Sequence, residues 1–437
     1  MLEQSKGLVV SSVGALEILD SRGRPTVQAR VTLADGTVAV AGVPSGASTG
    51  TGEAIERRDG DAARYGGLGV LGAVAAVSGE IAGCLTGREW PDLAAIDTAL
   101  IELDGTPGKS RLGANAIVGV SMACARALAA SGGQELWQWL TPDGVAPRLP
   151  VPHFNVVNGG VHAPGPLDFQ EFMIAPLGAP SFAEAVRAGV EVYAALRRLL
   201  KAAGQATGLG DEGGFAPQIA EPEEVLDMLV AAIADAGYVP GREGVAIALD
   251  PAASEFRGHD GRYRVAGQAL STAEMIERYA EITDRYPIWL IEDGLAEDDW
   301  DGWVALTQRL GARVQLVGDD IFVTNPAIIA EAISRGVANS ALIKVNQIGT
   351  VTETLAAIKT CCAGGYAQFV SHRSGETTDT FIADLTVGAG CGLLKSGAPA
   401  RGERVAKYNR LLEIAATQPG MPYGFVPHPR RPAGGRT

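Results

Sequence analysis

The sequence predicts an α/β protein in which a barrel of alternating strands and helices, residues 146–437, follows a smaller α+β domain, residues 1–145. Three observations support this prediction. Short apolar runs recur in the second part, and from Glu292 onward the ionisable residues that end them are 27, 25, 28 and 23 positions apart. Helical stretches such as NPAIIAEAISRG lie between these runs, as repeated βα units require. The segment TPDGVAPRLPVP, with four prolines, marks the boundary between the two parts.

The first part is expected to be small and mixed. Residues 14–42 predict two strands joined by a turn at ADGT. A loop rich in Gly, Ser and Thr follows, with the sequence VPSGASTGTGEA. From about residue 68 to 140, apolar residues recur at spacings of three and four, which is typical of helices. These features predict an α+β domain in front of the barrel.

Composition excludes several classes of partner and location. The chain has 437 residues, with 36 basic and 50 acidic side chains and a net charge of −14. Such an acidic balance argues against nucleic acid or an anionic membrane as the main partner. Five cysteines without a CxxC pair indicate free thiols in a reducing compartment. Because the sequence lacks a run of 18 apolar residues and a basic export signal, we expect a cytoplasmic protein.

Six ionisable residues end the apolar runs of the second part. The carboxyl ends of parallel barrel strands converge on one face, where catalytic side chains are found. Lys344, in the run ALIK, taken alone is explained by a side chain that reaches water at a strand end. Six such residues in register favour a functional site instead. They are Asp250, Glu292, Asp319, Lys344, His372 and Lys395.

The carboxylates and lysines in this set suggest metal-assisted proton transfer. Asp250, Glu292 and Asp319 would repel one another without a cation. A hard divalent ion resolves this, and ligation by oxygen alone favours magnesium. Lys344 and Lys395 follow on later strands, and we expect that, close to a metal and to each other, one of them has a depressed pKa and acts as a base.

Further polar residues complete the predicted chemistry. Glu212 in GLGDEGGFAP and Glu171 in QEFM supply carboxyl groups, and His372-Arg373-Ser374 offers an anion-binding cluster in which arginine suits phosphate. A lysine base, a carboxylic acid and a metal together suit removal of the weakly acidic proton next to a carboxylate.

The chain resembles the enolase family from about residue 14 to about residue 416. The resemblance implies a small α+β domain, a modified barrel that starts partly antiparallel, and dehydration of 2-phosphoglycerate to phosphoenolpyruvate. It rests on many long motifs in the same order, namely EILDSRG, VPSGASTG, GANAI, FNVVNGG, QEFMI, GDEGGFAP, AASEF, IED with EDDW, GDD, KVNQIGT, SHRSGET, DTFIADL and AKYN.

The resemblance also implies a role for each matching residue. Lys344 is expected to take the C2 proton, and Glu212, with Glu171 beside it, to protonate the leaving C3 hydroxyl. Two magnesium ions are expected at the site. The resemblance implies that the first ion is bound by Asp250, Glu292 and Asp319, and that the second is bound by Ser45 on a closing loop. It places Gln170 near the first ion and brings His162 and Lys395 into contact with the substrate. The pocket for the carboxylate and phosphate groups is expected to consist of His372, Arg373 and Ser374.

Some positions depart from the family pattern beside the predicted site. Val161 stands before His162 where the family has Ser or Ala, and prolines 164 and 166 follow in a segment that is polar and flexible in the family. These changes leave open a related substrate, a phosphonate analogue dehydrated to carboxyphosphonoenolpyruvate in natural-product biosynthesis.

The family forms dimers partly through two ion pairs between subunits. At the matching positions, Leu16 faces Glu403 and Gln28 faces Glu413, so neither pair has its complement. We therefore expect a homodimer with altered contacts.

Two functions of other classes were weighed. Residues 46–50, GASTG, fit the G-x-S-x-G pattern of serine hydrolases, but that pattern needs a strand directly before it and a helix directly after it, and this loop is rich in Ser, Gly and Thr on both sides. A non-catalytic binding protein on an enolase scaffold is the other possibility. No acid, base or metal-ligand position is lost, which favours an enzyme.

Overall fold

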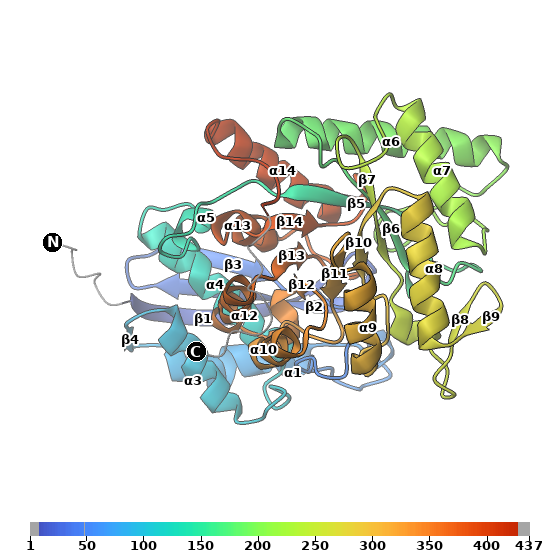
Figure 1. Cartoon of the computed structure of the whole chain (residues 1–437). Coiled ribbons are helices and arrows are strands. Elements are labelled where there is room, and N and C mark those ends of the chain that lie inside the picture. Colours follow the sequence, from blue (N-terminus) through green and yellow to red (C-terminus); the bar gives the residue numbers. More distant parts are fainter. Residues whose placement is uncertain (1–7, 48, 427–437) are drawn as a thin grey trace, which may run out of the picture.

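The computed structural model describes residues 8–47 and 49–426, which form a four-stranded sheet with helices beside a closed eight-stranded barrel (Figure 1). The sheet has the order β3-β2-β1-β4, and its paired strands are antiparallel. Its strands are β1 (Leu8–Leu19), β2 (Pro25–Leu33), β3 (Val38–Gly42) and β4 (Glu89–Trp90).

The prediction of two strands over residues 14–42 was wrong, because the structure has three strands there. The turn at ADGT does join two strands, β2 and β3, but a second turn separates β1 from β2. In that turn the Asp20 carboxylate accepts hydrogen bonds from the N–H groups of Arg22 (2.8 Å) and Arg24 (2.9 Å). Gly23 adopts a φ of +71°, a region that favours glycine. The short polar turn therefore interrupts what looks like one extended run.

The helices of the first part pack on this sheet. The long helix α4 lies against β2 and β3, and a Cβ added at Gly119 would lie 3.0 Å from Val43 and 3.2 Å from Ala29, so glycine permits this close approach. By length and apolar composition α4 could cross a membrane, yet 78% of it is buried inside the protein, as in a core helix. The helical elements here are η1 (Tyr65–Gly67), α1 (Leu71–Ala76), the π-helical turn η2 (Val77–Ile81), α2 (Ala82–Leu85), α3 (Leu93–Asp104), α4 (Ala114–Ser131) and α5 (Leu136–Trp139).

The second part is a closed barrel with strand order β10-β11-β12-β13-β14-β5-β6-β7. β6 pairs antiparallel with β5 and with β7, and every other neighbouring pair is parallel, so β6 alone runs against the other seven strands. The strands are β5 (Val151–Asn158), β6 (Glu171–Ala175), β7 (Ala246–Asp250), β10 (Ile288–Glu292), β11 (Gln315–Gly318), β12 (Ser340–Ile343), β13 (Ala367–Ser371) and β14 (Gly392–Lys395).

Helices surround the barrel, and local sequence signals define where several of them begin (Figure 1). Ser271 and Glu274 form a capping box, and Asn325 caps a helix whose first residue is Pro326. The outer helices are α6 (Phe182–Ala202), α7 (Pro222–Asp235), α8 (Thr272–Arg285), α9 (Trp300–Leu310), α10 (Pro326–Arg335), α12 (Val351–Gly364), α13 (Phe381–Gly388) and α14 (Gly402–Thr417). The short elements are η3 (Gly160–His162), η4 (Ala253–Phe256), α11 (Val345–Ile348) and the hairpin β8 (Tyr263–Val265) with β9 (Gln268–Leu270).

The predicted strand ends are confirmed. Three strands end on the expected residue, and three end one residue before it. A separate apolar cluster that includes Trp289, Leu290 and Phe369 fills the interior of the barrel. The polar residues at the strand ends therefore lie next to a packed core. The residues at the strand ends are Asp250, Glu292, Asp319, Lys344, His372 and Lys395.

A buried carboxylate links the two parts of the molecule and gives a prediction about stability. Asp97 on α3 accepts hydrogen bonds from the Thr352 N–H (3.0 Å) and the Thr352 hydroxyl (2.6 Å) on α12. Burial raises the pKa of Asp97 to about 6, and the bonds from Thr352 offset this only in part. The folded protein therefore binds a proton more tightly than the unfolded chain, and the resulting stability grows as pH falls through 6 and is absent at neutral pH.

Asp97→Asn should remove this pH dependence. Between pH 7 and pH 5 the wild type should gain about 1 kcal/mol of unfolding free energy relative to the variant, as measured by urea denaturation. The control is Asp301→Asn, at a side chain that is fully exposed, which should follow the wild type. A difference between wild type and Asp97→Asn that stays constant over this range would contradict the prediction.

Candidate functional site

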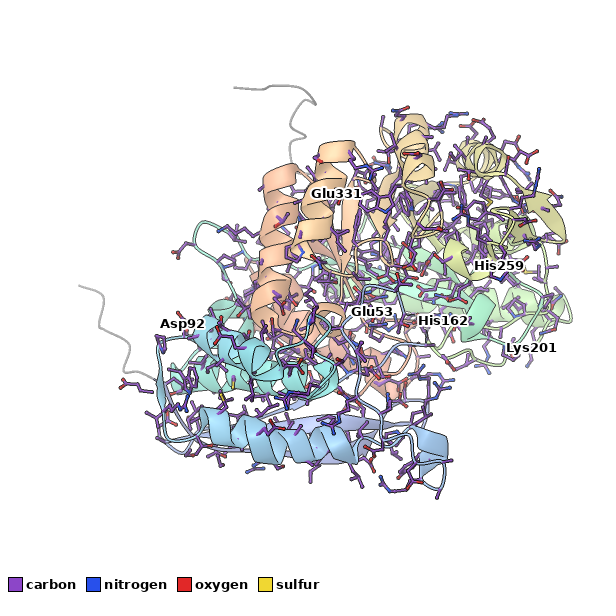
Figure 2. All side chains as sticks on the ribbon, turned by 90° about the horizontal axis from the view of Figure 1, so that it is seen from below. Glu53, Asp92, His162, Lys201, His259 and Glu331 are labelled. Atoms are coloured by element: carbon purple, nitrogen blue, oxygen red, sulfur yellow. The ribbon has the colours of Figure 1, made fainter. Side chains whose placement is uncertain are left out.

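The ionisable residues predicted at the strand ends gather around one small hollow at one open end of the barrel, which we call the mouth. Figure 2 shows His162 and Glu53 near the centre of the molecule, where the N-terminal part meets the barrel. Two residues of the predicted set, Glu292 and Ser45, do not line the hollow. The lining residues are Gly46, His162, Gln170, Glu171, Glu212, Asp250, Asp319, Lys344, Ser371, His372, Arg373, Ser374 and Lys395.

Lys395, the last residue of β14, is surrounded by carboxylates. Its Nζ lies 2.7 Å from Glu292, 3.1 Å from Glu171 and 3.4 Å from Asp250. Burial alone would lower the pKa of Lys395, but these carboxylates raise it well above its usual value. Burial raises the pKa of Glu292, and the charge of Asp250 raises it further. One ammonium therefore neutralises three acids only in part.

Lys344 forms an ion pair with Asp319, and both are buried. Gln347 also donates to Asp319 at 2.8 Å, and the Thr324 hydroxyl accepts from the Lys344 N–H at 2.9 Å. Burial favours a low pKa for Lys344, but the charge of Asp319 outweighs it and raises the pKa. The expected depression of a lysine pKa presupposes a metal ion beside the lysines and therefore stays a prediction.

The acidic residues of the mouth fit a divalent cation. Glu292 Oε2 is buried without a hydrogen-bond partner. Asp293, Asp319 and Asp320 offer oxygens within 4.8 Å of one another. Burial, followed by the charge of Asp319, raises the pKa of Asp320 to about 8. The buried negative charge thus exceeds what the two lysines balance, and all donors are oxygens, as magnesium prefers.

Two of these acids were missed by the sequence interpretation. Asp293 and Asp320 are the second carboxylates of the motifs IED and GDD, and only the first of each pair was considered. Asp293 accepts hydrogen bonds from the backbone N–H groups of Asp319 (2.7 Å) and Asp320 (3.0 Å). It therefore fixes the turn that follows β11.

Glu171 and Glu212 lie on either side of His162. The imidazole Nδ1 is 3.8 Å from Glu171 and 3.7 Å from Glu212, and it has no hydrogen bond to any of the described residues. Asn155 donates to Glu212 at 2.9 Å, and His372 Nε2 lies 3.1 Å away from it. Burial would raise the pKa of Glu212, but the two histidines bring it well below its usual value. Burial and the neighbouring Glu212 raise the pKa of Glu171, so the pKa values of the two acids shift in opposite directions.

Glu171 faces Lys344 across the barrel. β6 and β12 are four strands apart in a ring of eight, which places them on opposite sides. Because β6 runs against its neighbours, its first residue, Glu171, lies at the mouth, where it pairs with Asp250 at the end of β7. An acid and a base thus approach the hollow from opposite sides.

The segment His372-Arg373-Ser374 also lies at the mouth. Arg373 pairs with Glu53 from the N-terminal part, and Ser374 is contacted by Arg22 at 3.3 Å. Arg404 on α14 is fully buried and donates to His372 and to the backbone carbonyls of residues 211, 373 and 374. Glu53, Arg22 and Arg404 were not predicted, since nothing local in the sequence relates them to residues this far away.

Gln170 and Ser45 differ in how they relate to the site. Gln170 is buried at the mouth, with its Oε1 free of hydrogen bonds. Ser45 is buried too, but its hydroxyl donates to Glu56 (3.1 Å) and accepts from Arg58 (3.0 Å). The structure therefore does not bring the Ser45 hydroxyl to the acidic residues, because this pair already occupies it.

Two other sequence-based interpretations can be compared with the structure. Val161, the residue before His162, is 46% exposed and does not line the hollow. Ser48, the serine of the hydrolase-like pattern, lies outside the described residues. Residues 49–64 contain no helix, so the helix that the hydrolase pattern requires is missing.

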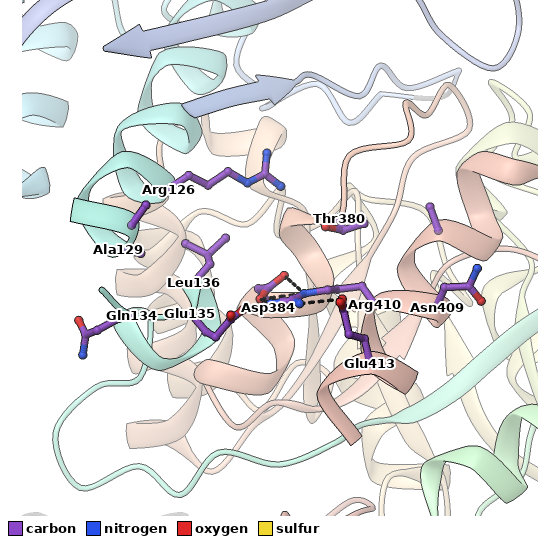
Figure 3. A pocket seen from close by; sticks show the side chains of 12 residues that line it. Arg126, Ala129, Gln134, Glu135, Leu136, Thr380, Asp384, Asn409, Arg410 and Glu413 are labelled. Atoms are coloured by element: carbon purple, nitrogen blue, oxygen red, sulfur yellow. Dashed lines mark hydrogen bonds and ion pairs between the residues drawn. The ribbon is translucent and has the colours of Figure 1, made fainter. Parts of the chain in front are cut away.

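A wider hollow lies away from the mouth, between α4, α5, α13 and α14 (Figure 3). Four of its charged side chains are paired with one another. Arg410 donates to Asp384 (2.7 Å), Glu135 (2.6 Å) and Glu413 (2.9 Å). Glu413, expected to lack a partner, therefore has one in its own chain.

A carboxylate-rich mouth with a lysine opposite a glutamate fits a carbon–oxygen lyase that works with a divalent cation. The family models described as the enolase N-terminal domain and the enolase C-terminal TIM barrel domain match residues 10–140 and 146–419. The chain is 57% identical to an enolase of Acidothermus cellulolyticus over 406 residues, which cover 93% of this chain and 94% of the relative. It is 56% identical to an enolase of Mycobacteroides abscessus over 409 residues (94% of both chains). It is 54% identical to an enolase of Rubrobacter xylanophilus over 420 residues (94% of this chain and 97% of the relative).

The chain belongs to the enolase family. It is a hydro-lyase that converts 2-phosphoglycerate to phosphoenolpyruvate, so its substrate is a small phosphorylated carboxylate. The comparisons give no support to the phosphonate analogue as the natural substrate or to a non-catalytic binding protein.

Proposed function

We propose that Lys344 removes the C2 proton of 2-phosphoglycerate and that Glu212, with Glu171 and His162 beside it, protonates the C3 hydroxyl as it leaves. The observation that carries this proposal is the position of β12 opposite β6 in the ring. With base and acid on opposite sides, the proton can leave from one face of the substrate and water from the other.

The remaining residues of the mouth would bind and orient the substrate. His372, Arg373 and Ser374 are proposed to hold its carboxylate and phosphate groups, since a guanidinium matches the geometry of both. Lys395, buried among acids, would place a positive charge where the enolate forms. The Gln170 Oε1 has no hydrogen-bond partner among the described residues, and we propose that it accepts a hydrogen bond from a group bound at the mouth.

We further propose that the cation is magnesium, with two ions per site. Asp250, Glu292 and Asp319 would hold the first. When bound, it would stabilise the negative charge of the enolate-like intermediate and replace the lysines as the counter-ion of the carboxylates. Ser45 is proposed for the second ion only after its loop releases Glu56 and Arg58, as a closing Gly- and Ser-rich loop could do.

The test of these roles is whether two partial reactions can be separated. Exchange of the C2 proton with solvent reports the base, and formation of phosphoenolpyruvate, followed by its absorbance, reports the whole reaction. A base variant should stop both processes, and an acid variant should stop only the second. Magnesium should be required for both.

Asp319→Ala should weaken magnesium binding at least about tenfold, because it removes one of three carboxylates and leaves Lys344 free to compete for the others. Isothermal titration calorimetry measures the change. The matched control is Asp301→Ala, a carboxylate with a fully exposed side chain on α9. Magnesium affinity equal to that of the wild type in Asp319→Ala would refute this ligand assignment.

The proposal for the assembled protein is a cytoplasmic homodimer, with the domain boundary between residues 145 and 146. Leu16 on β1 is 63% exposed, and it stands where the family has one half of an ion pair between subunits. Glu413 pairs with Arg410 in its own chain. The contacts between subunits would therefore be more apolar than in the family, and light scattering is the measurement that decides the oligomeric state.

A further inference from the structure

A carboxylate of the N-terminal part holds the arginine of the predicted anion pocket. Glu53 follows the Gly- and Ser-rich loop, and its two oxygens accept from Arg373 Nη1 (2.9 Å) and Nη2 (3.0 Å). Only 8% of the Glu53 side chain and 3% of the Arg373 side chain are exposed. This is a two-point, buried ion pair between residues 320 positions apart in the chain.

The same carboxylate is linked to the opposite half of the site. Gln347, which is fully buried, donates to Glu53 at 3.2 Å and to Asp319 at 2.8 Å. Its own carbonyl accepts from the Thr324 hydroxyl at 2.7 Å, which fixes the amide orientation. Glu53 therefore connects, through one amide, to the acid that pairs with Lys344.

Glu53 is also tied to the loop that precedes it. The N–H of Gly50 donates to Glu53 at 3.3 Å, and the N–H of Thr51 donates to Glu297 of the barrel at 3.1 Å. A Cβ at Gly50 would lie 2.7 Å from Val323 and 3.0 Å from the Asp320 carbonyl. The backbone of this loop thus rests closely on the turn that carries the acidic cluster.

We infer that Glu53 is a positioning residue that orients the Arg373 guanidinium for the anionic end of the substrate and joins this orientation to the docking of residues 50–53 on the barrel. The inference rests on the proposed role of Arg373. Arginine has many rotamers, and a planar fork binds phosphate well only in one orientation. Besides Glu53, the Asn346 side chain accepts from Arg373 Nη1 at 3.1 Å, but this amide carries no charge.

The chemical step does not pass through Glu53, so its loss should act on substrate binding. Glu53→Gln should raise KM for 2-phosphoglycerate about tenfold, while kcat changes less than about threefold. The reason is that the substitution removes the charge of one partner in a buried ion pair that acts on substrate binding. Glu53→Asp keeps the charge but shortens the side chain, and it should raise KM in the same direction by a smaller factor. The second variant keeps the test available if the first fails to fold.

Two comparisons separate this inference from its premises. Glu297→Gln removes the charge of a different carboxylate that contacts the same loop and should leave KM within about twofold of the wild type. Arg373→Lys should raise KM, and adding Glu53→Gln to it should cause no further rise, because the orientation that Glu53 imposes is already lost. A KM for Glu53→Gln within twofold of the wild type, or effects that multiply in the double variant, would overturn the inference. An unchanged KM in Arg373→Lys would instead refute the anion role of Arg373.

Discussion

Replacing Lys344 with alanine should reduce turnover of 2-phosphoglycerate by about 10³- to 10⁴-fold and stop exchange of the C2 proton with solvent. Lys344 is the cation at the mouth on the side opposite Glu171, and its backbone is fixed by Thr324. Without its amine, the proposed base is missing, and Asp319, the carboxylate beside it, is assigned to the metal, so both partial reactions should fail together. Exchange is measured by NMR with the substrate in heavy water.

The same variant should still bind magnesium. Removing the ammonium takes away a cation that pairs with Asp319, so calorimetry should give an affinity no weaker than that of the wild type. Lys359→Ala, at an exposed lysine on α12, is the control and should keep full activity. Exchange at the wild-type rate in Lys344→Ala would show that another group is the base.

The positions of the six strand-end residues could be predicted because they depend on a local pattern. Each apolar run is a buried strand, and each following charge sits where the backbone reaches the mouth. The apolar runs and their spacing therefore placed six residues on one face, namely Asp250, Glu292, Asp319, Lys344, His372 and Lys395. No knowledge of which helices pack together was needed.

The reversed strand could not be predicted in this way. A periodic pattern of apolar residues is the same whether a strand runs up or down, so the pattern favours a wholly parallel barrel. Because β6 is reversed, Glu171 is at the mouth as the first residue of its strand, not the last. Only the resemblance to the enolase family indicated an antiparallel start.

Contacts between residues far apart in the chain, and the balance of charge at the mouth, could not be predicted from the sequence either. Glu53 and Arg373 are 320 residues apart, and no local signal relates them. The hydroxyl of Ser45 is in a suitable loop but is bound by Glu56 and Arg58. The pKa of Lys344 depends on which cation balances Asp319, and this is a property of the whole mouth and not of one strand.

Glu212→Gln should uncouple the two partial reactions. We expect turnover to fall by about 10²- to 10⁴-fold, while C2 proton exchange stays within about tenfold of the wild type. Glutamine fits the same space and can still accept from Asn155, but it cannot release a proton to the C3 hydroxyl. The measurement is the ratio of exchange to phosphoenolpyruvate formation in one reaction mixture.

Glu171 is the other candidate for the group that donates a proton to the C3 hydroxyl. The charges of the mouth shift the pKa values of Glu171 and Glu212 in opposite directions, so variants of the two residues can be compared directly. In the ligand-free state the pKa of Glu171 is raised and that of Glu212 is lowered, with His162 between them. An anionic substrate should raise the pKa of Glu212 and draw a proton toward it. Glu171→Gln should then slow turnover but leave the ratio of exchange to turnover closer to that of the wild type. If Glu171→Gln keeps exchange and loses turnover, while Glu212→Gln loses both, the proton donor is Glu171, and Glu212 serves to orient the two histidines.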